Sequence, residues 1–114
     1  MATGSRIVCV SGQISLDEQG SVIGEGDLSA QAAQCYRNLF HALEGAGATF
    51  DHVAKVTVYV PDWSSDKMQL LVAGAMRAAQ ELGFDPRRPM TLIGVSALSN
   101  PNLLIEVEAM AVLP

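Results

Sequence analysis

The sequence has few basic residues, few cysteines and no long apolar run. Lysine and arginine number 7 against 12 acidic residues, which gives a formal net charge of −5. Apart from the adjacent Arg87 and Arg88 the basic residues are scattered, so we expect no surface that binds a nucleic-acid backbone. No stretch approaches the roughly 20 apolar residues that cross a bilayer, and the first residues lack the pattern of a secretion signal. The sequence therefore predicts a cytoplasmic protein without nucleic-acid or membrane partners.

The two cysteines, Cys9 and Cys35, lie in segments that are expected to form a strand and a helix. Neither belongs to a Cys-x-x-Cys motif or has a histidine at ligand spacing, so we expect no metal site. Unpaired cysteines are often buried, and we predict two buried, reduced thiols. The glycines of residues 24–26 flank a glutamate and lack the lysine of a phosphate-binding loop, so no cofactor is expected either.

The chain is short and rich in apolar residues. It has 114 residues, of which 49% are hydrophobic. A chain of this length fits one domain over residues 1–114, and it contains no repeat or linker. So high an apolar content in a small chain indicates that other subunits cover part of its surface.

The apolar patterns predict the order strand, strand, helix, strand, helix, strand, strand. Residues 28–46 and 64–83 have the apolar spacing of amphipathic helices, capped by Asp27 and by a serine at 64 or 65. Strands are expected at residues 6–16, 22–23, 53–60, 90–96 and 103–112. We predict an α+β fold, a mixed sheet with two helices on one face.

The last predicted strand alternates between an apolar side and a mixed side. The apolar side carries Ile105, Val107, Ala109 and Ala111, and the mixed side carries Leu104, Glu106, Glu108 and Met110. Successive side chains of a strand point to opposite faces of the sheet, so the carboxylates share the face without helices. A face of this composition suits a subunit interface that contains a solvated cleft, and it predicts a closed oligomer.

Four short motifs occur in an order that is typical of one family. They are VSGQI at residues 10–14, DLSAQA at 27–32, VAKVTVYVPD at 53–62 and IEVEAMAV at 105–112. Together they resemble the reactive intermediate deaminase (Rid, YjgF-like) family, whose older name is endoribonuclease L-PSP. The resemblance implies a chorismate-mutase-like fold, a homotrimer, and clefts between subunits that bind small metabolites. It also implies hydrolysis of reactive enamines and imines, such as 2-aminoacrylate, to ketoacids and ammonia.

The resemblance assigns roles to four residues. Glu106 matches the catalytic glutamate that positions water, and Gly12 matches a glycine whose backbone lines the substrate cleft. Family deaminases bind the substrate carboxylate with an arginine, which suits that task because its planar fork pairs bidentately. An ungapped comparison through residues 94–98 places Met90 at this position. Arg88 is an alternative substrate-binding residue, as a shifted comparison of residues 86–88 would have it, or else it is a solvated surface residue.

Three functions follow from these residues. The first is a divergent deaminase in which Glu106 orients water while Arg88 or a backbone amide holds the ligand. The second is a non-catalytic trimer that binds a less anionic metabolite, because Met90 offers apolar contact where relatives offer charge. A ribonuclease ranks last, since an acidic chain without a basic patch has poor means of binding RNA.

Overall fold

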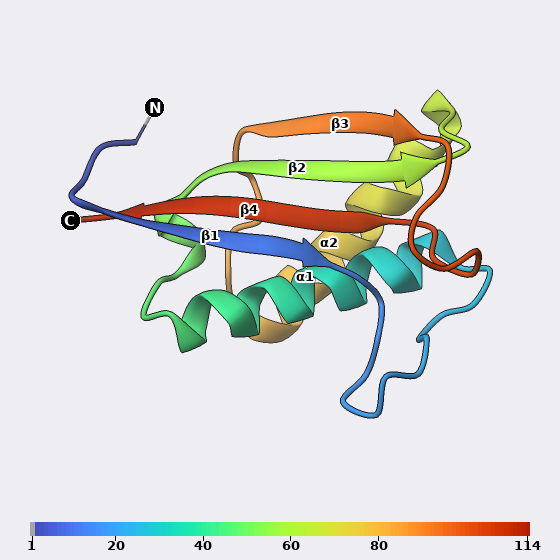
Figure 1. The fold of residues 1–114 in the computed structure, drawn as a ribbon, viewed down its shortest axis with the longest axis horizontal. Helices are drawn as coiled ribbons and strands as arrows, with labels where there is room; N and C mark the ends of the chain where they lie inside the picture. The colour runs from blue at the N-terminus through green and yellow to red at the C-terminus, as the bar shows by residue number, and fades with distance from the viewer. Residues whose placement is uncertain (1) are drawn as a thin grey trace.

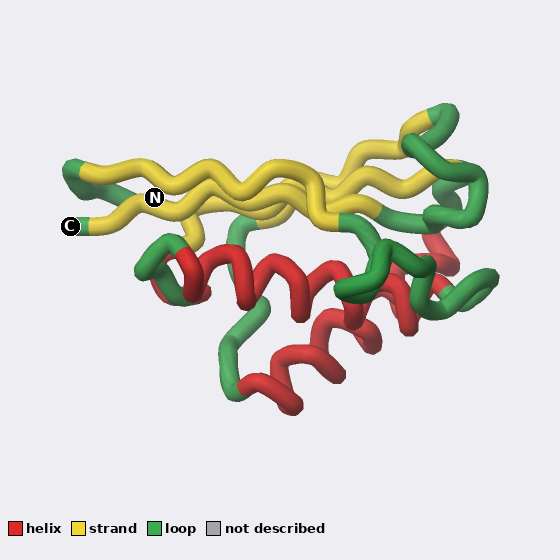
Figure 2. Tube along the Cα trace, turned by 60° about the horizontal axis from the view of Figure 1, so that its bottom comes forward, coloured by secondary structure: helices red, strands yellow, loops and turns green. Residues whose placement is uncertain are grey.

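The computed structural model describes residues 2–114, which form a four-stranded sheet lying on two helices (Figures 1 and 2). The strands are β1 (Arg6–Gln13), β2 (Val53–Pro61), β3 (Met90–Val95) and β4 (Glu106–Leu113). They lie in the order β1-β4-β2-β3, and only β2 and β3 run parallel. The helices are α1 (Leu28–Gly45) and α2 (Met68–Leu82). The predicted α+β class, with a mixed sheet and two helices on one face, is confirmed.

Alternation along the strands separates a covered face from an uncovered one. Val56, Val58 and Val60 of β2 are at most 1% exposed and pack in the core against the helices. Lys55 and Tyr59 point the other way and are more accessible, whereas Thr57, which lies between them on that side, is buried. Both helices lie beneath the same face of the sheet (Figure 2). Nothing in residues 2–114 covers the opposite face.

The N-terminal part of the sheet is smaller than predicted. β1 ends at Gln13, and the expected strand at 22–23 is reduced to a single bridge between Leu16 and Val22. Gly24 and Gly26 both have positive φ angles, of 75° and 72°, so the chain turns before a second pair can form. Asp27 then caps α1 as predicted, because its carboxylate accepts a hydrogen bond from the Ala30 amide at 3.0 Å.

The last strand begins at Glu106, three residues later than predicted. A glutamine side chain forms hydrogen bonds with the backbone groups just before it, so these groups do not pair with another strand. Gln31 of α1 is fully buried. Its Oε1 accepts from the Leu104 amide at 2.8 Å, and its Nε2 donates to the carbonyl of Asn102 at 2.9 Å and to that of Gly24 at 3.1 Å. Buried backbone groups must be paired, and here a side chain does what a neighbouring strand would otherwise do.

The start of α2 also differs from the prediction. A short 3-10 turn, Ser65–Lys67, precedes the α-helix, and neither predicted serine caps it: Ser64 makes no capping side-chain hydrogen bond. Gly83 ends α2 in the left-handed conformation at φ 77°, as expected of a glycine at a helix C-terminus.

The prediction of two buried thiols is wrong for one of them. Both cysteines are free, but Cys9 is exposed while Cys35 is buried. Cys9 alternates along β1 with Val10, which is 8% exposed and belongs to the core, so Cys9 lies on the uncovered face. Among residues 2–114, no helix is long and apolar enough to cross a membrane.

Candidate functional site

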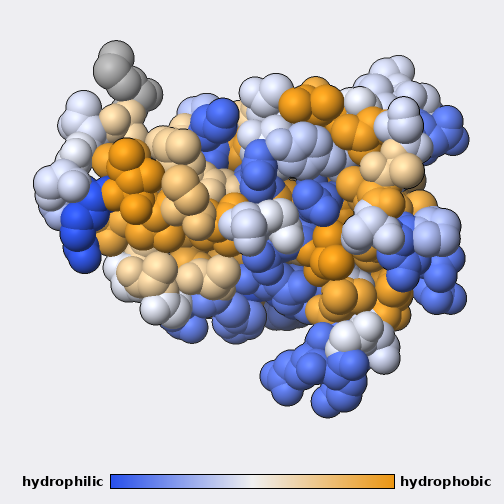
Figure 3. Space-filling view, in the orientation of Figure 1, coloured by the Kyte–Doolittle hydropathy of each residue, from blue (hydrophilic) through white to orange (hydrophobic). Residues whose placement is uncertain are grey.

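The uncovered face of the sheet combines apolar and polar side chains. Figure 3, in the orientation of Figure 1, shows apolar surface toward both ends of the strands and hydrophilic surface between them. A depression of about 270 Å³ crosses β1, β4 and β2 on this face. Its lining includes Cys9, Ser11, Lys55, Thr57, Glu108 and Met110.

Glu106 and Gly12 lie together beside an irregularity in β1. Val10 pairs with Ala109 and Gln13 pairs with Val107, so two residues of β1 oppose one of β4. This is a β-bulge, a feature common next to active sites because it re-aims the chain. A Cβ atom added at Gly12 would lie 2.3 Å from Oε2 of Glu106. The glycine therefore leaves the space in which the Glu106 carboxylate lies against the bulge.

The two glutamates of β4 on this face have different surroundings. Glu108 accepts a short hydrogen bond from the hydroxyl of Tyr59. Glu106 is half-buried, and among residues 2–114 no group donates a hydrogen bond to its carboxylate or forms an ion pair with it. Both oxygens of the Glu106 carboxylate are therefore available to accept hydrogen bonds from water, whereas one oxygen of Glu108 is already bound to Tyr59.

Tyr59 stands between these carboxylates. It is paired in register with Glu106 across β2 and β4. The hydrogen bond to Glu108 raises the pKa of Tyr59, with a smaller contribution from the charge of Glu106. The hydroxyl therefore stays protonated and keeps donating. The sequence alone does not identify Glu108 as the partner of Tyr59, because that pairing depends on the strand register.

Cys35 lies behind Glu106 on the covered side of the sheet. Burial raises the pKa of its thiol to about 12, and the charge of Glu106 contributes. Its sulfur donates a long hydrogen bond of 3.8 Å to the carbonyl of Ile105. A thiol in these surroundings is not a nucleophile at neutral pH, because the thiolate is the reactive form.

Met90 and Arg88 form a separate group at the start of β3. Met90 is paired in register with the core residue Val56, so its side chain faces the helices and not the uncovered face. Both residues line a cavity of about 390 Å³ that is otherwise formed mainly by α1, α2 and the segment before β3. Arg88 donates from Nη2 to Oδ1 of Asp51 at 3.2 Å, and its side chain is only 24% exposed. Arg88 is therefore a partly shielded residue held in an ion pair with an exposed carboxylate, and the structure leaves both interpretations of it open.

The structure thus brings the four predicted site residues together in two pairs. Gly12 also borders a second depression, of about 610 Å³, whose lining includes Arg37. Arg37 is bound to Glu81 through two hydrogen bonds, of 2.8 and 3.2 Å, and so is occupied. No cluster of three or more metal-ligating side chains occurs within residues 2–114.

The fold and the motifs define a class, and comparison with known proteins identifies it. The family described as Endoribonuclease L-PSP matches residues 2–113. The chain belongs to this family, which is also called Rid.

Three relatives illustrate the similarity. The RutC family protein slr0709 of Synechocystis is 32% identical over 106 residues, covering 91% of this chain and 76% of that protein. The 3-aminoacrylate deaminase RutC of Acinetobacter baylyi is 29% identical over 106 residues, covering 93% of this chain and 79% of that protein. The crystal structure of the Rid-family protein YyfB from Yersinia pestis superposes with a TM-score of 0.81 at 37% identity, covering 96% of this chain and 80% of that one.

Proposed function

We propose that this protein hydrolyses a reactive enamine or imine in a cleft between subunits of a homotrimer, with Glu106 as the catalytic carboxylate. The observation that carries the proposal is the position of Glu106, half-buried against the bulge at Gly12 with its oxygens unpaired. The deaminase activity of the Acinetobacter relative supports the same reaction class.

The chemistry asks little of the protein. An enamine takes a proton at carbon and an imine takes one at nitrogen, so that both give an iminium ion. Water adds to the iminium carbon, and one of its protons passes to the Glu106 carboxylate as the C–O bond forms. Glu106 returns that proton to the nitrogen of the resulting carbinolamine, ammonia leaves, and the hydroxyl proton passes back to Glu106 as the carbonyl group forms. A single positioned carboxylate can therefore serve as base and then as acid.

A trimer would explain why the site residues fall into two pairs. In one chain, Met90 faces the helices while Glu106 lies on the uncovered face. We propose that the cavity of Arg88 and Met90 in one subunit adjoins the Glu106 and Gly12 pair of the next. Large apolar side chains exposed on the strands, with Ile7 65% and Ile93 41% accessible, support burial of this face by another copy.

The direct test is release of ammonia from freshly generated 2-aminoacrylate and 3-aminoacrylate, compared with the spontaneous reaction. Glu106→Gln keeps the size of the side chain but removes its basicity, so we expect turnover to fall about a hundredfold or more. Glu108→Gln is the matched control, because its amide oxygen can still accept from Tyr59. Equal activity of the wild type and Glu106→Gln would contradict the assignment.

A second candidate, a non-catalytic metabolite-binding trimer, is favoured by one observation. Each arginine near Met90 already has a carboxylate partner: Arg88 binds Asp51, and Arg87 binds Asp85. If the wild type does not accelerate hydrolysis but Met90→Arg does, this function replaces the first. The family's ribonuclease description is not extended to this chain, because the net charge of −5 opposes RNA binding.

A further inference from the structure

One side chain of α1 binds the backbone just before Glu106. Gln31 is fully buried, and its amide group is paired at both ends. The oxygen accepts from the Leu104 amide at 2.8 Å, and the nitrogen donates to the carbonyls of Asn102 and Gly24 at 2.9 and 3.1 Å. Both protons of the side-chain amide thus have an acceptor. The segment that leads into Glu106 is therefore held by α1 through two of its backbone groups.

A second side chain of α1 binds the backbone just after β1. Asn38 follows Gln31 by seven residues, which places the two on the same side of the helix. Its Nδ2 donates to the carbonyl of Ile14 at 2.9 Å and to that of Leu16 at 3.3 Å. The chain that leaves β1 is therefore held by the same helix as the chain that enters β4.

The two contacts lie where β1 and β4 part. The strands pair as far as Gln13 and Val107. In a ladder that continued in this register, residues 14–16 would oppose residues 104–106. Side chains of α1, which lies beneath this end of the sheet in Figure 1, bind backbone groups of both segments instead. Glu106 therefore lies at the point where α1 sets the separation of the strands.

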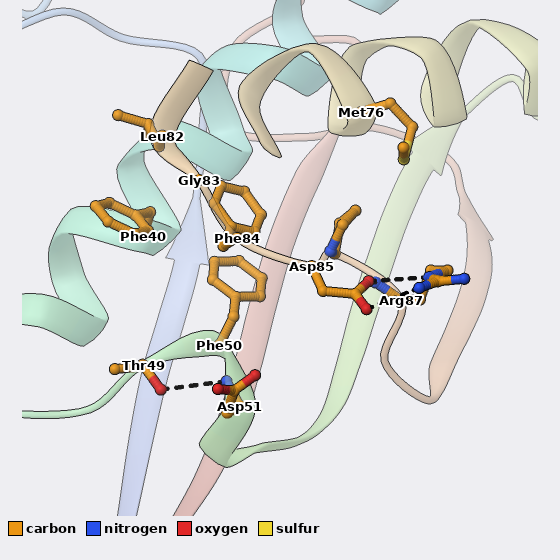
Figure 4. A pocket seen from close by; sticks show the side chains of 11 residues that line it. Phe40, Thr49, Phe50, Asp51, Met76, Leu82, Gly83, Phe84, Asp85 and Arg87 are labelled. Carbon is orange, nitrogen blue, oxygen red and sulfur yellow. Dashed lines mark hydrogen bonds and ion pairs between the residues drawn. The ribbon is translucent and has the colours of Figure 1, made fainter. Parts of the chain in front are cut away.

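The other end of α1 is held by apolar contacts. Figure 4 shows Phe40 of α1 near Phe84, which stacks on Phe50, and the ring centroids are 5.5 and 4.0 Å apart. Charged side chains of that region bond to each other, as Arg87 does to Asp85 through two hydrogen bonds of 3.0 Å. An apolar contact fixes distance, whereas a hydrogen bond also fixes direction, and a buried polar group costs free energy unless it is paired. The paired polar contacts at the first end are therefore suited to hold a backbone in one orientation.

We infer that Gln31 and Asn38 are positioning residues for the reaction at Glu106: they hold the ends of β1 and β4 so that the Glu106 carboxylate lies in the space beside Gly12. The inference rests on the proposed function, because it concerns the reaction assigned to Glu106. Gln31 is fully buried and does not touch the reactant, so it acts only through the backbone. A displaced catalytic group slows the chemical step more than it weakens binding, so the loss should fall on kcat and not on KM.

Kinetics of the full chain give the first test. Gln31→Met keeps the length of the side chain but removes its hydrogen bonds. For ammonia release from 2-aminoacrylate we expect kcat to fall at least about tenfold while KM changes less than about twofold. Phe50→Leu is the control, because it removes a ring stack at the other end of α1 and should lower stability to urea without lowering kcat. Equal losses of kcat in the two variants would overturn the inference.

Asn38→Leu is the second variant, used also in case Gln31→Met does not fold as judged by circular dichroism. Asn38 is only half-buried, so its replacement disturbs the core less. We again expect a lower kcat at an unchanged KM, because the carbonyls of Ile14 and Leu16 lose their donor. A wild-type kcat in this variant would overturn the inference for Asn38.

Amide NMR of the full chain tests the position of the carboxylate without turnover. Glu106→Gln removes a charge beside Gly12, so it should shift the amide signal of Gly12. If Gln31 holds the carboxylate there, the same substitution in a Gln31→Met background should shift that signal by less than about half as much. An equal shift in both backgrounds, or no shift in the wild-type background, would overturn the inference.

The two measurements separate this inference from the proposed function. If the wild type turns over no imine, the proposed function fails, while a reduced NMR shift in the Gln31→Met background still supports the positioning of Glu106. If the wild type is active and Gln31→Met retains its kcat, the inference fails and the assignment of Glu106 stands.

Discussion

Two glutamates on β4 show how neighbouring residues determine which carboxylate is available for hydrogen bonding. Glu106 and Glu108 are two positions apart on one strand and point to the same face. The hydroxyl of Tyr59 donates a hydrogen bond to the Glu108 carboxylate. Because glycine has no side chain, Gly12 leaves room for the Glu106 carboxylate. Within residues 2–114, Glu106 thus has both carboxylate oxygens available to water, whereas Glu108 has one of them bound to Tyr59.

Gly12→Ala tests this role for a glycine. The added methyl group would overlap the Glu106 carboxylate, which can move because it is the end of a flexible side chain. We therefore expect a folded protein whose turnover falls roughly ten- to a hundredfold, since small displacements of a catalytic group are costly. Ser11→Ala, at the other bulge position, is the control and should retain activity. Full activity of Gly12→Ala, measured by ammonia release, would show that the carboxylate does not act from this position.

The sequence predicts the pair of Glu106 and Gly12 only through the family's motifs. The two residues are far apart in the chain, and their contact depends on a bulge that shifts the register of β1 against β4. Met90 shows where family motifs and strand alternation fail to predict the direction of a side chain. Strand alternation is readable from sequence, but the register of β3 against β2, which turns Met90 toward the helices, is not.

Whole elements are more predictable, because their apolar periodicity is regular. The sequence predicts both helices and strands β1 to β4, and the errors lie at the ends of elements and in the shortest strand. Gln31 satisfies the backbone at residues 102–104, so β4 is shorter than its apolar pattern. The predicted strand at 22–23 is only a bridge, because the chain turns at Gly24 and Gly26 before a second pair can form.

The packing of α1 on α2 gives a prediction at this scale. A Cβ atom at Gly74 of α2 would lie 2.2 Å from the Ser29 carbonyl oxygen of α1, and that backbone cannot move alone. Gly74→Ala should lower the free energy of unfolding by about 1 to 3 kcal/mol, because the helices must separate. Urea denaturation measures the change.

Gly45 of α1 provides the control for this prediction. A Cβ atom there meets nothing within 4 Å, so Gly45→Ala is expected to be neutral or to stabilise by up to about 1 kcal/mol. If the two alanine variants changed stability equally, close contact between the helices would not explain Gly74.

The whole molecule is a two-layer structure in which only one face of the sheet is covered. Its helices cover one face of the sheet, and apolar side chains stand exposed on the other (Figures 2 and 3). We propose that a homotrimer covers this face and joins the two pairs of site residues across each subunit boundary. A site shared in this way has a property that a site within one chain lacks: subunits with different defects can complement each other.

Mixing Glu106→Gln and Arg88→Gln subunits measures this property directly. Each variant alone should be inactive, and each keeps the half of the site that the other lacks. After joint refolding in equal amounts, random assembly gives about a quarter of the clefts both intact halves, so about a quarter of wild-type turnover should return. Mixed trimers are verified by mass with differently tagged chains. Mixed trimers that form but recover no activity would contradict the account, because they would show that the catalytic residues act within one chain.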